Sequence, residues 1–146
     1  MDVKQVLKIE KRLYFKNNKE YLKEMLFNSN TYNIWIWQIA LRKEEYYSKK
    51  KNFIAMLLLV YWRNRKNRLG RKLGFDIPGG VFSVGLRIWH ISSVVVNPFA
   101  RVGKNAVIVG DLCIGNNDGK RIAAYIGDNC IFGWGVCCNW RYKNCK

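Results

Sequence analysis

The sequence predicts a mainly β fold, a parallel β-helix built from hexapeptide repeats, preceded by an α-helical N-terminal region. Up to about Lys72, apolar residues recur at helical spacing among many basic side chains, whereas from Gly74 onward Gly, Val and Ile replace the charged residues. In this second part the aliphatic residues recur every six positions, and an alternating sandwich would show a period of two. We therefore divide the chain into a basic helical region, 1–72, a β-helix domain, 73–136, and a tail, 137–146.

The length and composition limit the class of protein. A chain of 146 residues has room for one modest domain with a helical appendage. Hydrophobic residues make up 49% and charged residues 25%, which excludes disorder as the overall state. The longest apolar run, Phe53 to Trp62, has ten residues, about half of the ~20 that a membrane-spanning helix needs. Because the first residues also lack an apolar signal core, we expect a cytoplasmic protein without an integral membrane segment.

The charge is unevenly distributed. The net charge is +16, and residues 1–72 hold 18 basic and 6 acidic side chains. Such a region attracts nucleic acid, anionic lipid or another polyanion, or it is only a solvated helix surface. Since no nucleic-acid-binding motif is present, we expect a solvated surface and no nucleic-acid partner.

Three helices are predicted in the basic region. The first carries apolar residues at helical spacing between Val3 and Tyr14, and two more are predicted for 32–47 and 53–69, the last ending at Gly70. The asparagines around 17 and 28 predict loops or caps. Aromatic residues are dense here, and we expect them to pack between helices, with stacking on nucleic-acid bases as the alternative.

The period of six assigns each residue of the second region a place in a coil. One place is mostly aliphatic, with the residues Val84, His90, Val96, Val102, Ile108, Ile114, Ile126 and Phe132. The fourth place after it is small or aliphatic, with the residues Ile88, Val94, Ala100, Ala106, Leu112, Cys130 and Val136. The place that directly follows the first is mostly Gly or Asn, where we expect corners with positive φ. Coils of this kind are stable only when stacked, and the one break, 116–125, predicts an ejected loop.

Three stretches carry a family resemblance. They are GFDIPGGVFSVGLRIWH, VVVNPFARVGKNAVIVGDLCIG and NNDGKRIAAYIGDNCIFGWG. With the preceding LRKEEYY and WRNRKNRLGRKLGF, they resemble the serine O-acetyltransferase group of hexapeptide acyltransferases over about residues 41–136. The resemblance implies a left-handed β-helix, a homotrimer with sites between subunits, and acetyl transfer from acetyl-CoA as co-substrate to a hydroxyl.

The resemblance assigns the general base to His90, the only histidine in the chain, because it ends the GLRIWH element. The chemistry agrees, since a hydroxyl must lose its proton as it attacks a thioester carbonyl. A general base of this kind contributes roughly 10²–10⁴-fold. The repeat places His90 where an aliphatic residue is expected, which makes a polar ring unusual there. The alternative is a satisfied histidine at a coil corner.

Other family positions are matched only in part. Asp76 lies near the place of a family Asp, although the spacing to His90 is one residue short, and Trp89 stands where an Asp would precede the base. In the predicted loop Arg121 stands for a substrate-binding Arg, but Ala123 replaces its His partner. The alternative for Arg121 is a solvated loop charge.

The family binds CoA along the coils through backbone at small residues. Gly115, Gly133 and Gly135 match those places, and corner geometry is the alternative role. No metal is expected, because the five cysteines form no Cys-x-x-Cys pair and the single histidine is distant.

The resemblance thus implies an O-acetyltransferase, with serine as the first acceptor, as in cysteine biosynthesis. The missing Asp and His leave a sugar of a capsule or surface polysaccharide as the alternative. A second alternative is an inactive truncated fragment or a basic scaffold that binds a polyanion. Truncation enters because the repeat stops at CCNWRYKNCK, and dropping one base from suitable codons yields VVIGDIKIA, which continues the repeat. We therefore expect a frameshift at the start of the tail.

Overall fold

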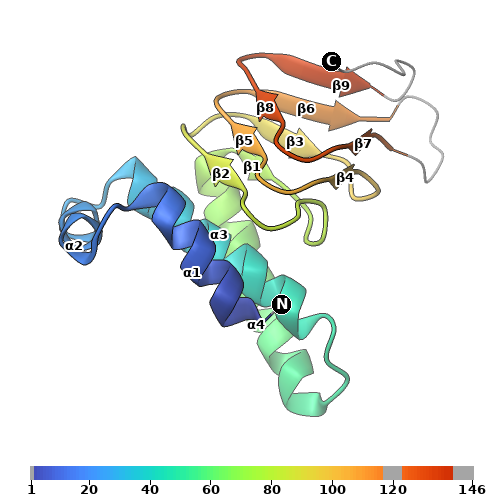
Figure 1. Ribbon diagram of the computed structural model, residues 1–146. Coiled ribbons are helices and arrows are strands. Elements are labelled where there is room, and N and C mark those ends of the chain that lie inside the picture. Colours follow the sequence, from blue (N-terminus) through green and yellow to red (C-terminus); the bar gives the residue numbers. More distant parts are fainter. Residues whose placement is uncertain (1, 117–122, 140–146) are drawn as a thin grey trace. The chain divides into compact units, whose positions relative to one another are not determined.

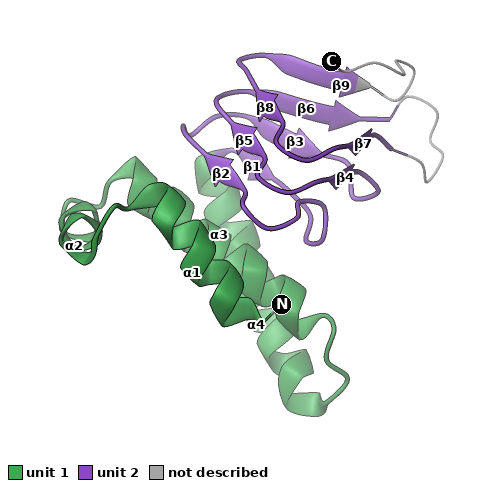
Figure 2. Ribbon diagram, in the orientation of Figure 1, with its two compact units in different colours: residues 1–73 green, residues 74–146 purple. Residues whose placement is uncertain are grey.

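The computed structural model describes residues 2–116 and 123–139 (Figure 1). The chain forms two compact units, residues 1–73 and 74–146, which we describe separately (Figure 2). The division lies one residue from the boundary expected from the change in sequence pattern.

The first unit consists of helices, and α3 packs along α4 and also contacts α1 and α2. The side chains of Asn17 and Ser29 cap α2 and α3 by accepting hydrogen bonds from backbone N–H groups. Among the described residues, none of the helices is both long enough and apolar enough to cross a bilayer. The helices are α1 (Val3–Tyr14), α2 (Asn18–Leu26), α3 (Asn30–Tyr47) and α4 (Phe53–Leu73).

Two details of the helices differ from the sequence prediction. A helix, α2, forms in a stretch for which no helix was predicted, and Asn17 is its N-cap, one of the two roles expected for the asparagines there. The predicted end of the last helix at Gly70 is wrong. The helix continues to Leu73 and stops at Gly74, whose φ of +78° is the left-handed conformation that ends many helices.

The core of the helical unit combines aromatic packing with buried charge. Trp35 and Trp37 are buried, as the expected packing between helices requires. The same unit holds a fully buried carboxylate, Glu10, which accepts hydrogen bonds from Arg42 Nη2 at 2.8 Å and from Arg42 Nε. Arg42 Nη1 binds Glu45 Oε2 at 2.8 Å. Burial alone would lower the pKa of Arg42, but the two carboxylates raise it above its ordinary value.

The second unit contains short parallel strands in three sheets (Figure 1). The sheet orders are β1-β3-β6-β9, β2-β5-β8 and β4-β7. From β2 onward, successive strands visit the three-stranded, four-stranded and two-stranded sheets in fixed rotation. The strands are β1 (Phe75–Asp76), β2 (Arg87–Ile88), β3 (Val94–Val96), β4 (Arg101–Val102), β5 (Val107–Ile108), β6 (Leu112–Gly115), β7 (Tyr125–Ile126), β8 (Ile131–Phe132) and β9 (Val136–Asn139).

The pairing register explains why the sequence repeats every six residues. Val94 pairs with Leu112, 18 residues later, so one turn through three sheets takes three hexapeptides. The next turn takes 24 residues, from Leu112 to Val136, because six extra residues lie between β6 and β7. The predicted loop falls at this insertion, and residues 117–122 lie outside the described part of the chain.

Burial confirms most of the predicted interior places. The predicted residues that are buried are Ile88, Val94, Val96, Ala100, Val102, Ala106, Ile108, Leu112, Ile114 and Phe132. Ile126, Cys130 and Val136, in the last turn, are only half-buried. The prediction fails at the start of the repeat, where Val84 is likewise half-buried and His90 is exposed. The reason is a change of spacing in the first turn, where Phe82 rather than Val84 bridges to Val102.

The expectation of positive φ at the Gly and Asn corners is also mostly wrong. Gly85 has a φ of +92°, but the φ of Gly103 is not positive. Position 103 needs glycine for another reason, because a Cβ there would meet the backbone of Asp128 at 2.6 Å. The positive φ values recur instead at Asn105 and Asn129, one turn and two turns after Gly85. Their side chains join through Asn105 Nδ2, which donates to Asn129 Oδ1 at 3.0 Å.

The last described strand extends into the predicted tail. Cys137 and Cys138 pair with Cys113 and Ile114, and Cys138 is buried. Cys138 thus occupies a buried position at which the frame-restored sequence VVIGDIKIA would have an aliphatic residue. The frameshift, the left-handed winding and the trimer stay predictions.

Candidate active site

The candidate site lies at the corner that joins the three-stranded sheet to the four-stranded sheet. This corner occurs three times, between β2 and β3 (89–93), between β5 and β6 (109–111) and between β8 and β9 (133–135). The second and third corners have three residues, and the first has five. The two extra residues remove His90 from the repeat, so its ring is exposed at the corner rather than buried between sheets.

The ring of His90 stacks on an indole from two turns further along the chain. The ring centroids of His90 and Trp134 are 5.8 Å apart and the planes differ by 25°. Trp134 also covers Gly110, where a Cβ would lie 2.3 Å from the indole carbons. Glycine at 110 therefore allows the indole to lie across the middle corner and reach the histidine. Sequence reasoning missed Trp134, and the absence of any side chain at 110 was the available signal.

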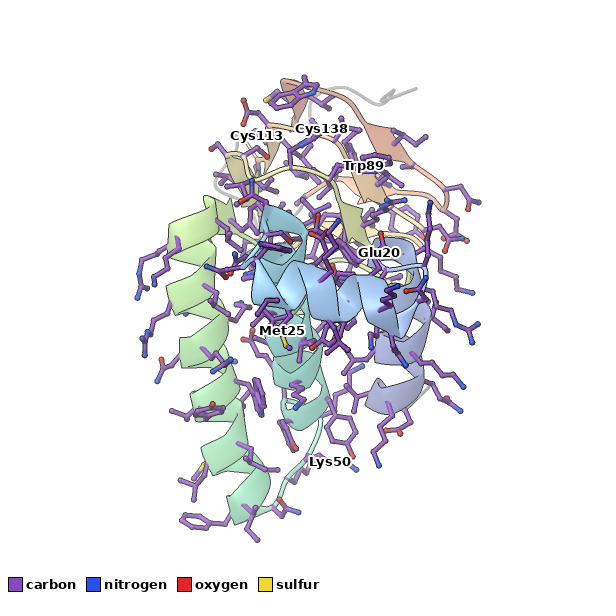
Figure 3. The ribbon with its side chains drawn as sticks, turned by 90° about the vertical axis from the view of Figure 1, so that its left-hand side faces the viewer. Glu20, Met25, Lys50, Trp89, Cys113 and Cys138 are labelled. Atoms are coloured by element: carbon purple, nitrogen blue, oxygen red, sulfur yellow. The ribbon has the colours of Figure 1, made fainter. Side chains whose placement is uncertain are left out.

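A second exposed indole adjoins the histidine in the sequence. Trp89 is about half exposed, and the Arg87 guanidinium lies over its ring at 4.2 Å from the centroid. Figure 3 labels Trp89 among the side chains of the β unit. This cation–π contact holds the indole at the surface next to the candidate base. An aromatic surface therefore takes the place at which the family resemblance led us to expect an acid.

The rest of the corner contains two further polar features. Ser92 Oγ is buried and has no hydrogen-bond partner in the part of the chain that the structure describes. The next residue is fixed from the following turn, because Ser93 N donates to Asp111 Oδ1 at 2.8 Å. Asp111 thus connects the enlarged corner, 89–93, to the equivalent corner of the next turn, 109–111. Neither Ser92 nor Asp111 was expected from the sequence.

Asp76 is not joined to His90. It lies on β1, pairs with Val95 across the four-stranded sheet and is exposed. Among the described residues there is no hydrogen bond or ion pair between this carboxylate and the histidine. A role of Asp76 as the partner of the base therefore has no support in this arrangement.

The three glycines expected to contact CoA have different surroundings. Gly133 and Gly135 flank Trp134 in the third corner, and a Cβ at either one meets nothing within 4 Å. Gly135 has a φ of +70°, which explains glycine there, whereas Gly133 needs neither a positive φ nor extra space. Gly115 ends β6, where a Cβ would make only ordinary contact with Cys113. Arg121 lies outside the described residues.

Two cysteines face each other on the outer surface of the four-stranded sheet. Cys113 and Cys137 are register partners on β6 and β9, and both are exposed. Partial burial, and then a hydrogen bond and charge interaction with Cys137, raise the pKa of the Cys113 thiol. Within the described residues no group of three or more His, Cys, Asp or Glu is arranged to hold a metal ion.

The comparisons with known proteins do not identify the chain. Family models, curated proteins and solved structures all give no match. The function of the chain is therefore inferred from the corner geometry and from the sequence motifs.

Proposed function

We propose that this chain is an acetyl-CoA-dependent O-acetyltransferase in which His90 is the general base. The observation that carries the proposal is the position of this single histidine. An insertion of two residues lifts it out of the stacked interior, and its ring is exposed and packed flat against Trp134. A structural histidine at this place would instead be expected to fill the corner or bind backbone groups.

The proposal includes a left-handed β-helix and a homotrimer. Parallel pairing, rotation through three sheets and an 18-residue turn support the coil. The left-handed winding of the coil and the homotrimer are implied by the family resemblance, of which the GLRIWH element is a part. In a trimer of this type the exposed corner with His90 would face a neighbouring subunit and the acceptor.

The proposed reaction needs few groups from this chain. The imidazole of His90 takes the proton of the acceptor hydroxyl as its oxygen bonds to the acetyl carbon. The carbon–sulfur bond of the thioester then breaks, and the departing thiolate takes the proton back from the imidazolium. Trp134 orients the imidazole by stacking on it. Gly133 leaves room for acetyl-CoA beside the same indole, because nothing lies within 4 Å of its missing side chain.

Serine is the first acceptor proposed, and one observation favours the sugar alternative. The acid expected next to the base is replaced by the exposed indole of Trp89, and Asp76 forms no hydrogen bond or ion pair with His90 among the described residues. A site for serine must pair the amino group of the substrate with a carboxylate. An indole surface beside the base suits instead the apolar face of a sugar ring, as in a surface-polysaccharide precursor.

An acceptor screen tests the proposal. The release of CoA thiol from acetyl-CoA is followed with serine, then with amino sugars and nucleotide sugars, for the wild type and for His90→Ala. We expect acceptor-dependent release that falls at least about 100-fold in His90→Ala, the lower limit for loss of a general base. Thiol release with sugars but not with serine would show that the acceptor is a sugar. Release that is equal in both proteins, or absent with every acceptor, would contradict the proposal.

A further inference from the structure

The first half of α4 carries an apolar face that the helical unit leaves exposed. Residues 53–62 are FIAMLLLVYW, with no charged side chain. Ala55 is buried and Leu58, Leu59 and Trp62 are less exposed than their neighbours, so these positions form the inner side of the helix. The outer positions are all more than half exposed, and they are Phe53, Ile54, Met56, Leu57, Val60 and Tyr61.

These six residues, which we call the α4 apolar face, share one side of the helix. At 3.6 residues per turn, positions 53, 57, 60 and 61 follow one another along a single stripe, with 54 and 56 on its two edges. Ile54 is 69% exposed although it is surrounded by other apolar residues. Adjacent exposed apolar side chains of this kind mark interaction surfaces rather than ordinary solvent-facing helices.

Basic residues lie at both ends of the α4 apolar face. Lys49, Lys50 and Lys51 precede it, all exposed, and Figure 3 shows Lys50 at the connection between α3 and α4. Arg63 and Arg65 follow it. From 46 to 75 the chain carries many basic residues and no acidic one. Glu44, which precedes this stretch, pairs with Arg63 and Lys66. No acidic residue follows Lys49, Lys50 and Lys51 in the sequence before Asp76.

The charge pattern decides between the partners that an apolar face can take. A second copy, in either direction, would bring one basic end against another, with no acidic side chain in the segment to offset the repulsion. Nucleic acid would use the basic residues but leave the apolar side chains in water. An anionic bilayer satisfies both, because acyl chains accept the apolar face and lipid phosphates accept the lysines.

We propose that the α4 apolar face is an interfacial membrane anchor. The first half of α4 would lie in the plane of the membrane, with its apolar side chains at the boundary between headgroups and acyl chains. Lys49–Lys51 would contact anionic headgroups at the start of the helix. The helix does not span the bilayer, which agrees with its apolar length. This inference is independent of the proposed acetyl transfer and rests on the helical unit alone.

Vesicle flotation tests the anchor with the full chain. Vesicles of phosphatidylcholine are compared with vesicles that also contain phosphatidylserine, for the wild type, Ile54→Glu/Leu57→Glu, and Lys49→Gln/Lys50→Gln/Lys51→Gln. The matched control is Ile131→Glu, which changes an exposed apolar residue of the other unit. Circular dichroism verifies that each variant keeps its helices, as expected for substitutions at exposed positions.

We expect the wild type and Ile131→Glu to bind the anionic vesicles, and binding to weaken with added salt. The glutamate pair should abolish binding, and loss of three lysines should weaken it roughly 100-fold, at about fivefold for each lysine near an anionic surface. Unchanged binding by the glutamate pair would overturn the proposal, because the α4 apolar face would then not be the part of the chain that contacts the bilayer. Absent vesicle binding, together with a self-association that the glutamate pair removes, would overturn it in favour of a second copy.

Discussion

The interiors of the two units differ in the kind of side chain that they bury. The β unit has an interior of aliphatic side chains from successive turns, in which each turn repeats the packing of the previous one. The helical unit encloses charged side chains along with its aromatic residues, because the ion pairs of Arg42 with Glu10 and of Lys66 with Glu44 are both buried. The interior of the β unit thus consists of many similar apolar side chains, whereas the interior of the helical unit also contains ion pairs.

This contrast indicates where single substitutions should do most damage. Truncating one apolar side chain in a stack removes its transfer free energy and leaves a cavity, around which the neighbouring turns can partly relax. A buried charge without its partner has no such relief, because it is left unpaired in a medium of low polarity. We therefore expect substitutions to separate the two units by the size and the origin of their effect.

The largest effect is expected for Arg42→Met. Glu10 is fully buried, and the substitution removes the guanidinium with which it pairs, which should lower the free energy of unfolding by about 3–5 kcal/mol. Urea unfolding monitored by helical circular dichroism measures the change. The double variant Glu10→Gln/Arg42→Met should lose clearly less, because no unpaired charge remains. An equal loss in both variants would show that packing rather than charge stabilises this core.

The next effect is expected in the β unit for Ile108→Ala. Ile108 is fully buried between its register partners Ile88 and Phe132, so the truncation leaves a cavity between two turns. The free energy of unfolding should fall by about 2–5 kcal/mol. Val107→Ala, on the same strand but only half-buried, is the matched control and should lose markedly less. Equal losses would mean that the interior of the stack is not at Ile108.

A smaller effect is expected at the His90 corner. Gly110→Ala places a methyl group where the Trp134 indole lies, and because Trp134 is 63% exposed the indole can swing away at little cost in stability. The ring-proton NMR signals of His90, the only histidine, should therefore shift as the stacking is lost. Gly133→Ala, which meets nothing within 4 Å, should leave them in place. A shift in Gly133→Ala but not in Gly110→Ala would contradict this geometry.

The smallest effect concerns the paired thiols of the β unit. Because its pKa is raised, Cys113 should hold less thiolate at a given pH and react with iodoacetamide only at higher pH than an ordinary cysteine. In Cys137→Ala the pH midpoint of this reaction should fall, yet remain above the ordinary value because burial is the larger cause. Peptide mass spectrometry across pH measures each cysteine separately. An unchanged midpoint in Cys137→Ala would contradict the pairing of these thiols.

The β unit was largely predictable from sequence because its signal is repeated. Each turn restates the same aliphatic places, so residues such as Val102, Ile108 and Ile114 could be assigned to the interior from spacing alone. The prediction failed for His90 because it assumed a constant spacing of six residues. The two extra residues in the corner at 89–93 do not change the repeat from Val94 onward, so the repeat gave no sign of them. The stack of His90 on Trp134 could not be predicted either, because 44 positions separate the two residues and only the register aligns them.

The helical unit was less predictable because its decisive interactions do not repeat. Glu10 and Arg42 appear in the sequence as two of many charged residues, and nothing in their spacing distinguishes them from a solvated surface. Only the packing of α1 on α3 brings them together. The end of α4 shows the same limit, since Gly70 and Gly74 are both plausible stops and the conformation of Gly74 selects the second.

A crystal structure of the full chain grown with CoA is the sharpest test of the proposed coil and its site. We expect the second unit to wind left-handed through three parallel sheets, with the CoA thiol beside the exposed ring of His90 and the indole of Trp134. Antiparallel strands in this unit, or a thiol bound away from that corner, would contradict the proposal.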